Sequence, residues 1–552
     1  MPKDFLKRGI GLLFKRQSNI LSAALVIMAT IIFSQILGLI RQRLLVGIFG
    51  ASNTLGIYLA SARIPDFLFQ LIIAGALSSA FIPVFSEYLG KGKEKEAHRL
   101  GSTLLFSGLL IFLILSVFLF IFASDISKVV APGFSSSQIK LMADLTRIVI
   151  FGEMLFILGS FLSAMLQSYN HFFIPGIASA TFNLGIIIGI VVLSPYVGIF
   201  SAAYGVILGS LLFVLVQLPL VRRVGFSFRP SFSLRSSGAL DVLRLMWPRT
   251  LSIGIFQLGT LVTVTLVSFL PNPGRNYVIF DYAQTLAFAP VALFGQAIAQ
   301  AAFPVLSKER ERLNDFKTTF ITSLSQMLYL VLPISALLLV LRIPVVRLIY
   351  GAAQFDWAAT VLTGTTLAFF SISIFAQSLV YLVSRGFYAL HDTKTPLIIG
   401  ALTTGLMILV GAIFVFIYHF GIESIAIAYS IGGIVNILIL LIFLDRKVGG
   451  FEKLPLVFSL AKITLATLFT GFALYIPIKL LDQLVFDTTK TINLLFLTGI
   501  SSFAGLSLYL FLTWLFDVKE ATMFIHLFKR LGDWRQILKG SQETIDGTRF
   551  NP

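Results

Sequence analysis

Charged side chains occur in this sequence inside stretches that are otherwise apolar enough to cross a lipid bilayer. Within residues 34–84, Arg41 follows a long apolar run, and Arg63 and Asp66 interrupt the next one. A charge is costly in lipid, so such side chains should face a protein interior or a water-filled cavity. Arg63 and Asp66 are three residues apart on one helical face, and we expect them to pair there. Arg43 is expected to lie at the end of its helix and to extend its guanidinium to the lipid headgroups.

Further polar residues are embedded in apolar stretches along the rest of the chain. An internal repeat pairs the segment of Asp281 and Gln284 with that of Arg63, so we expect these side chains to face one another. For each residue the alternative is a buried pair that only fixes helix packing, and for Asp281 also a position at the outer membrane surface. The further polar candidates inside expected spans are Gln35, Gln70, Arg147, Glu153, Asn183, Arg249, Asp281 and Gln284.

The sequence contains no catalytic constellation. It has no G-x-S-x-G, P-loop or H-E-x-x-H motif, only five histidines and no cysteine. The lack of cysteine excludes disulfides, thiolate chemistry and cysteine-based metal sites. We therefore expect a protein that is not an enzyme, with no catalytic residue, no metal site and no cofactor.

The composition is that of a membrane protein. Of the 552 residues, 57% are hydrophobic and 12% are charged, whereas soluble domains have about 25% charged residues. Residues 154–221 contain no Asp, Glu, Lys or Arg, which leaves room for several spans of about 20 residues each. Apolar and polar residues do not alternate with a period of two, so the spans should be helices and not strands of a barrel. The predicted fold class is an all-α polytopic membrane protein.

Fourteen transmembrane helices fit the hydropathy pattern, and the first twelve contain an internal repeat. Pro83 and Pro304 close corresponding helices, Pro175 and Pro396 open another corresponding pair, and each pair is 221 residues apart. Six helices per repeat predict two six-helix lobes of like orientation, related by a pseudo-two-fold axis along the membrane normal. The expected spans are 18–41, 54–86, 99–123, 138–168, 172–194, 199–221, 243–270, 277–306, 317–341, 357–389, 396–418, 422–444, 457–479 and 491–516.

The loops between these spans are alternately rich and poor in Lys and Arg. The positive-inside rule places the basic loops and both termini in the cytoplasm. The net charge of +17 reflects this topology and an attraction to anionic lipid, and a nucleic-acid partner is not expected. In chain order we expect a basic cytoplasmic N-terminal segment (1–17), an N-lobe (18–221), a basic cytoplasmic linker (222–242), a C-lobe (243–444), two further helices (445–516) and an amphipathic basic tail on the inner membrane surface (517–552).

Six short motifs are distributed along the chain. They are Ser34-x-x-Leu37-Gly38-x-x-Arg41, Gly75-Ala76-Leu77-x-x-Ala80-Phe81-x-Pro83, Ala131-Pro132-Gly133-Phe134, Gln217-Leu218-Pro219, Phe303-Pro304-x-Leu306-Ser307 and Arg385-Gly386-Phe387-Tyr388-Ala389-x-x-Asp392-Thr393-x-Thr395-Pro396. Together they resemble the MurJ (MviN) family of lipid II flippases, in the multidrug/oligosaccharidyl-lipid/polysaccharide exporter superfamily. The resemblance covers about residues 18–515 and also implies fourteen helices in two lobes plus a final pair.

The resemblance implies a function as well as a fold. The expected function is translocation of a lipid-linked peptidoglycan precursor, with an undecaprenyl-pyrophosphate head group, from the inner to the outer leaflet by alternating access. It implies a monomer in the bacterial plasma membrane, driven by membrane potential or an ion gradient. Its expected partners are the lipid-linked saccharide, membrane lipids and cell-wall synthases.

The sequence departs from this family at several polar positions. Gln35 and Gln70 stand where the family usually has arginine, Gln42 where it has aspartate, and Gln284 where it begins an Asp-Arg pair. Of the arginines that line the cavity in this family, only Arg41 is plainly kept in this sequence.

These matches and departures imply roles for the polar residues. Arg41 is expected to be the main ligand of the pyrophosphate, because a guanidinium offers planar, multidentate donors. Arg63 and Arg249 are expected to substitute for missing arginines, and Asp66 and Glu153 to hold these arginines or to relay protons. The remaining candidates are assigned to substrate binding (Gln35, Gln70, Gln284) or to coupling or a charge pair (Arg147, Asp281).

Two other functions stay open at this point. One is a flippase for another glycolipid, or an exporter of drug-like substrates, in the same superfamily. The other is a non-transporting scaffold with this fold, which the lost arginines favour. Some relatives bind sodium where this sequence offers Thr263 and Gly411 and no carboxylate, so we expect transport without a sodium requirement.

Overall fold

The computed structural model of the chain describes residues 20–74, 81–226, 230, 237–352, 354–484 and 490–521. Every regular element in these ranges is a helix, which confirms the predicted fold class. The elements are α2 (Ile20–Phe49), α3 (Asn53–Phe69), the π-helix η1 (Gln70–Ala74), α4 (Ile82–Gly90), α5 (Glu94–Ile121), α6 (Ala123–Val130), α7 (Ser136–Ser168), α8 (Phe173–Val197), α9 (Phe200–Arg223), α10 (Ser237–Ser268), α11 (Pro273–Pro290), the π-helix η3 (Val291–Gln296), α12 (Ala297–Lys308), α13 (Leu313–Val340), α14 (Arg342–Tyr350), α15 (Trp357–Ser371), α16 (Ile374–Ala389), α17 (Lys394–Phe416), α18 (Glu423–Lys447), α19 (Lys453–Leu484) and α20 (Thr491–Leu515).

The expected fourteen spans agree closely with these helices. Among the described residues, twelve helical segments are long and apolar enough to cross a membrane. α15 and α16, which meet at a bend of 43°, provide a thirteenth if they form one broken span. The remaining expected span, 243–270, lies in α10, whose apolar part is shorter (Ile253–Ser268).

α2 is longer than the sequence suggested. The expected span ended at residue 41, whereas the helix continues to Phe49. Arg41 and Arg43 therefore lie inside a continuous helix and not at its end. Beyond α2, Ser52 accepts a hydrogen bond from the backbone N–H of Leu55 and caps α3, which fixes the direction of the next helix.

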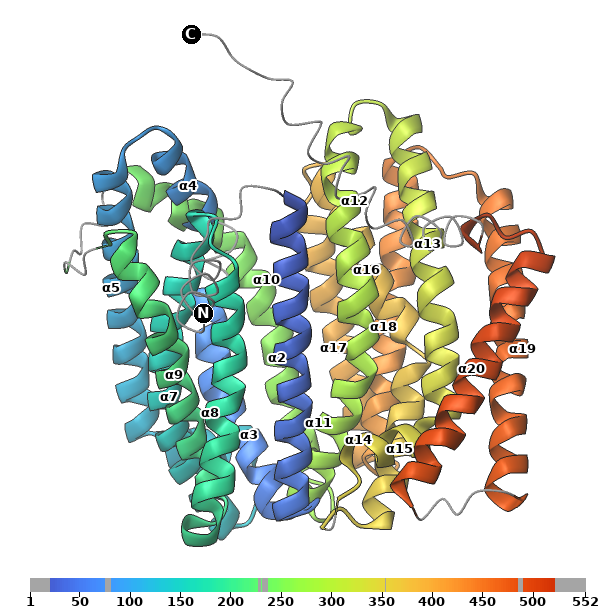
Figure 1. Cartoon of the computed structure of the whole chain (residues 1–552), viewed down its shortest axis with the longest axis horizontal. Helices are drawn as coiled ribbons and strands as arrows, with labels where there is room; N and C mark the ends of the chain where they lie inside the picture. The colour runs from blue at the N-terminus through green and yellow to red at the C-terminus, as the bar shows by residue number, and fades with distance from the viewer. Residues whose placement is uncertain are drawn as a thin grey trace, which may run out of the picture. The chain divides into compact units, whose positions relative to one another are not determined.

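The chain divides into two compact units, and the first comprises Met1–Gln284, Ile349–Thr366 and Leu397–Gly432. In this unit α8 packs along α9 and α2, while α7 packs on α9 and α3. Figure 1 shows α7, α8 and α9 running side by side. Glycines permit the close approach of α8 and α9, since a Cβ on Gly185 would lie 2.4 Å from the Cα of Gly209.

The second unit comprises Thr285–Leu348, Leu367–Pro396 and Gly433–Pro552. Here α19 packs on α20 and α13, and α12 packs on α16. The Tyr509 hydroxyl of α20 donates a 2.7 Å hydrogen bond to the backbone carbonyl of Tyr329 on α13. The outward side chains of α19 and α20 are large and apolar, for example Phe472 and Phe503 at 66% and 76% exposure, as expected for helices in lipid.

Three expectations fall on residues outside the described ranges. They concern the basic segment 1–17, most of the motif that begins at Gly75, and the amphipathic part of the tail from residue 522 onward. The lobe boundaries and the pseudo-two-fold axis inferred from the repeat stay predictions, because the two compact units follow packing and not the repeat.

Candidate functional site

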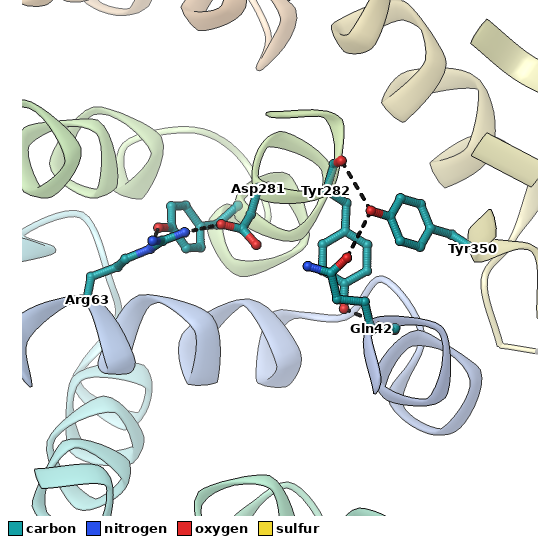
Figure 2. A network of polar contacts seen from close by, with 6 residues as sticks. Gln42, Arg63, Asp281, Tyr282 and Tyr350 are labelled. Carbon is teal, nitrogen blue, oxygen red and sulfur yellow. Dashed lines mark hydrogen bonds and ion pairs between the residues drawn. The ribbon is translucent and has the colours of Figure 1, made fainter. Parts of the chain in front are cut away.

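Arg63 on α3 is held by two side chains of α11. Its guanidinium forms an ion pair with the Asp281 carboxylate, and its Nε donates a 2.9 Å hydrogen bond to the Tyr277 hydroxyl (Figure 2). Tyr277 and Asp281 are one helical turn apart, so both present oxygens to the same guanidinium. Asp281 is only 7% exposed, and the expectation that it faces Arg63 is confirmed.

Arg63 and Asp66 interact electrostatically, as expected from the sequence, but they form no ion pair with each other. Arg63 extends toward α11, and Asp66 instead accepts a 3.4 Å hydrogen bond from Gln70 Nε2, one turn further along the chain. Glu153 on α7, which packs against α3, interacts electrostatically with Asp66 and Tyr58. Across the described residues neither Asp66 nor Glu153 forms an ion pair with a cationic side chain. Two carboxyl groups thus lie near one another, and Arg63 acts on Asp66 only electrostatically.

Gln42 on α2 is the centre of a second network. The Tyr282 hydroxyl donates to the Gln42 backbone carbonyl (3.2 Å), and the Tyr350 hydroxyl donates to Gln42 Oε1 (3.1 Å), as Figure 2 shows. The two rings also contact each other, with centroids 4.6 Å apart. Both tyrosine side chains are fully buried, so these hydrogen bonds satisfy groups that water does not reach. The Gln42 amide therefore has a structural role.

Arg43 does not extend to the lipid headgroups, as the sequence had suggested. Its guanidinium donates to the backbone carbonyls of Ile349 (3.3 Å) and Gly351 (2.9 Å). These carbonyls lie at the C-terminal end of α14, where a helix leaves its last carbonyls unpaired and attracts a cation. Arg43 is therefore a capping residue for α14.

Arg41 is different from its neighbours. Within the part of the chain that the structure describes, its guanidinium forms no hydrogen bond and no ion pair. It is half-buried, and its charge acts on the phenols of Tyr58 and Tyr282 without a carboxylate partner. A guanidinium left without a counter-ion inside a transmembrane helix is costly unless something anionic binds it.

Arg147 on α7 has a local role. It pairs with Asp144, three residues earlier on the same helix, at 2.8 Å. Its Nε donates to the backbone carbonyl of Phe120, and its guanidinium lies 5.8 Å from the centroid of that ring. These contacts join α7 to the end of α5. Arg147 therefore fits the alternative stated in the sequence analysis, a charge pair that fixes helix packing.

The other sequence candidates are less connected. Gln35 is exposed and Gln284 is half-buried, and neither has a hydrogen-bond partner among the described residues. Arg249 belongs to α10, but its side chain lies outside what the structure describes. Asn183 on α8 donates hydrogen bonds to the backbone carbonyl and the hydroxyl of Ser34 on α2.

The N-terminal ends of α3 and α11 meet in a contact that the sequence did not indicate. A Cβ on Gly56 would lie 1.8 Å from the Gly274 carbonyl oxygen, so neither glycine can carry a side chain without displacement of a helix. The backbone N–H of Arg275 donates a 3.1 Å hydrogen bond to Asn53 Oδ1. The Arg275 guanidinium forms a bidentate ion pair with the Asp356 carboxylate, with both hydrogen bonds at 2.8 Å. The hydrogen bonds from Arg275 hold the pKa of the Asp356 carboxyl below its ordinary range.

Three tyrosines of these networks were missed by sequence reasoning, namely Tyr277, Tyr282 and Tyr350. Isolated tyrosines in an apolar helix are common at membrane interfaces and carry no signal of a buried hydrogen bond. The one available signal was the spacing of Tyr277 and Asp281 at i and i+4, which places their oxygens on one face.

Comparison with known proteins identifies the family. The sequence model of the family described as "Lipid II flippase MurJ" matches residues 45–495, which is most of the chain. The chain belongs to the MurJ family of lipid II flippases. Consistent with its apolar helices, it is a multi-pass membrane protein.

Curated relatives extend over nearly the same length. A probable lipid II flippase MurJ of Thermotoga maritima is 30% identical over 441 residues, which is 79% of this chain and 87% of the relative. A probable lipid II flippase MurJ of Buchnera aphidicola subsp. Acyrthosiphon pisum is 29% identical over 471 residues, or 84% and 91%.

Solved structures show the same fold. A structure described as lipid II flippase MurJ in an inward closed conformation has a TM-score of 0.74 and 25% identity, and the match covers 89% of this chain and 98% of that one. An inward-facing multidrug resistance MATE family transporter of the MOP superfamily matches with a TM-score of 0.64 at 15% identity, over 78% of this chain and 99% of that one. The second likeness concerns the fold alone.

Proposed function

We propose that this chain is a flippase for a lipid-linked peptidoglycan precursor of the lipid II type. Its membership of the MurJ family and its spans support this function. The precursor would carry an undecaprenyl-pyrophosphate head group and would move from the inner to the outer leaflet by alternating access. The protein would be a monomer in the bacterial plasma membrane, with both termini in the cytoplasm.

The observation that carries this proposal is the uncommitted guanidinium of Arg41. Insertion of an arginine at the centre of a transmembrane helix costs about 3 kcal/mol on scales from translocon experiments. An anionic partner must offset this cost. The nearest neighbours along the helix, Gln42 and Arg43, are occupied by Tyr350 and by α14 carbonyls, and Arg41 is left available. A pyrophosphate is multiply anionic and accepts several hydrogen bonds from one planar guanidinium.

Arg63 contributes to the proposed site in a different way from that expected. Its charge is already matched by Asp281, so it serves to hold α3 and α11 together and is not a free phosphate ligand. Arg249 stays a proposed second ligand on α10. Asp66 and Glu153 lie near each other, and one proton shared between their carboxyl groups would lower their mutual repulsion.

No covalent step is needed for such transport, and we propose that the protein acts without a cofactor. Movement of one net charge across the membrane gains about 2.3 kcal/mol per 100 mV, so membrane potential or a proton gradient is the proposed driving force. Membrane lipids and enzymes of cell-wall synthesis are the proposed partners. The basic loops would bind the anionic headgroups of the inner leaflet.

The experiment is to replace the native lipid II flippase in cells depleted of it. The parent chain should restore growth, and Arg41→Ala should not, although it reaches the membrane in normal amount. Arg147→Ala is the matched control, because this arginine has local partners on α7 and α5 and should still support growth. Arg41→Lys should restore growth in part, since a point charge replaces the planar guanidinium.

The open alternatives give other results. A scaffold without transport would leave depleted cells to die even with the well-folded parent chain. An exporter of drug-like substrates would also fail to restore growth, but it would protect cells against such a substrate. A flippase for another glycolipid would fail to restore growth too, but it would move that glycolipid across the membrane in a direct assay. Normal growth with a well-folded Arg41→Ala protein would remove Arg41 from the phosphate site.

A further inference from the structure

α2 lies along α8 through three consecutive positions of one helical face. Thr30, Ser34 and Gly38 recur at intervals of four and form this face. At the N-terminal end of this face, a Cβ on Gly176 of α8 would lie 2.1 Å from Thr30 Oγ1, so the two helices are in close contact there. One turn on, Asn183 of α8 meets Ser34.

Asn183 is the only amide side chain of α8, and it connects the two helices. Its Nδ2 donates to the Ser34 backbone carbonyl (3.2 Å) and to the Ser34 hydroxyl (3.3 Å), and also to the Ser179 carbonyl of its own helix (3.4 Å). A Cβ on Gly38 would stand 3.8 Å from Asn183 Oδ1, so the amide occupies the space beside this glycine. Asn183 thus fixes both the rotation and the height of α2 against α8.

Arg41 extends the same face of α2. It lies seven residues, about two turns, beyond Ser34, so any rotation of α2 about its axis moves Arg41 together with Ser34. α8 has no charged residue that could pair with Arg41. Farther along, Gln42 and Arg43 are bonded to other elements. The direction of the uncommitted guanidinium is therefore set by hydrogen bonds on either side of it.

We propose that Asn183 is a positioning residue for Arg41, which aims the free guanidinium at the phosphate of the transported lipid by holding the register of α2 on α8. The proposal rests on the phosphate role of Arg41 under the proposed function. Because the Asn183 amide is bonded to Ser34 and Ser179, its loss should act through the position of Arg41.

The first experiment measures binding of a polyprenyl pyrophosphate to the purified full chain in nanodiscs. Asn183→Ala should weaken binding about fivefold, which is the effect of one lost interhelical hydrogen bond. Arg41→Ala should weaken it further, and the Arg41→Ala/Asn183→Ala double variant should bind no worse than Arg41→Ala alone. Thr181→Val is the matched control on α8, because its hydroxyl donates only within its own helix, and it should bind as the parent does.

The second experiment reads the direction of residue 41 without a substrate. The chain has no cysteine, so Arg41→Cys provides a single reactive thiol. Asn183→Ala should change its rate of modification by a water-soluble thiol reagent, whereas Thr181→Val should not. Asn183→Gln, which keeps a donor, should restore part of the parent rate. Ser34→Ala, which leaves the backbone carbonyl in place, should have a smaller effect than Asn183→Ala.

The outcomes separate the two proposals. An unchanged labelling rate at residue 41 in folded Asn183→Ala protein overturns the positioning role, and so do additive losses of binding in the double variant. If Arg41→Ala binds the pyrophosphate as well as the parent, the phosphate role under the proposed function is overturned, and the labelling rate then decides the role of Asn183 by itself. A melting temperature within the range of the Thr181→Val control shows that each variant is folded.

Discussion

Arg63 forms an ion pair with Asp281, 218 residues away in the sequence, while Asp66, three residues away on its own helix, is left to Gln70. The pair joins α3 to α11, and the Tyr277 hydroxyl completes the environment of the guanidinium. A transmembrane arginine is thus neutralised by a distant helix and not by its nearest carboxylate. Among the described residues, this leaves the Arg41 guanidinium without an ion-pair partner.

The buried pair should be more costly to break than to remove. Arg63→Ala leaves the Asp281 carboxylate buried without a cation, and should destabilise the protein by about 3 kcal/mol. Arg63→Ala/Asp281→Ala should cost less than the sum of the two single changes, because neither partner is left charged and alone. The measurement is thermal unfolding in detergent. Strict additivity of the two losses would contradict the pairing.

The Gln42 network should behave as one unit. Tyr350→Phe and Gln42→Ala each remove the same hydrogen bond, so each should cost about 0.6–1.5 kcal/mol and the double variant little more than either. Gln42→Asp keeps an acceptor and should be less damaging than Gln42→Ala. Phe355→Leu, a nearby change that leaves this hydrogen bond intact, is the control for lost packing against Tyr350. Unfolding curves of the four single variants and the double variant test this.

Acid should weaken the contact between Arg275 and Asp356. The pKa of Asp356 is lowered from 3.8, chiefly by the hydrogen bonds from Arg275. A carboxyl with a depressed pKa contributes stability that is present above about pH 4 and is lost as the pH falls through its folded pKa. Asp356→Asn should therefore reduce the loss of melting temperature between about pH 5 and pH 3. An identical pH profile for parent and variant would exclude this contribution.

The topology can be tested with single cysteines, since the chain has none of its own. Lys95→Cys, in an exposed position at the start of α5, should be protected from an impermeant reagent added outside intact cells. Ser136→Cys, exposed at the start of α7, should react. Gly92 and Asn272 are poor choices because both have positive φ angles, of 71° and 49°, that a cysteine disfavours. Labelling of Lys95→Cys from outside would invert the proposed orientation.

Transport should not require sodium. Thr263 donates its hydroxyl to the Gly259 carbonyl of its own helix at 2.9 Å, and Gly411 offers no side chain. Neither position supplies the carboxylate that a sodium ion favours, so sodium should be replaceable by another monovalent cation at constant membrane potential. Transport of the lipid in reconstituted vesicles measures this. A steep loss of transport without sodium would contradict the expectation.

The amino-acid sequence by itself determined the class of protein and the positions of its helices. Long runs without charge can be stable in lipid only as helices, so most expected spans agree with observed helices, apart from the longer α2 and the shorter apolar part of α10. The i, i+3 and i+4 spacings also identified helical faces, and the repeat indicated that Asp281 would face Arg63. The motifs that resemble the MurJ family indicated the transport of a lipid-linked precursor.

Only the tertiary structure decided which polar groups are committed. A sequence fixes the face from which a side chain leaves its helix, but a long arginine side chain can reach partners on several helices. Arg63 therefore forms its ion pair with Asp281 and not with Asp66. Arg43 donates hydrogen bonds to carbonyls at the end of α14 and does not extend to the headgroups. The tyrosine hydroxyls of α11 and the backbone carbonyl of Gly351 form hydrogen bonds with residues more than 200 positions away in the sequence. Arg41 differs from Gln42 and Arg43 because, in the part of the chain that the structure describes, each of these two has a hydrogen-bond partner and Arg41 has none.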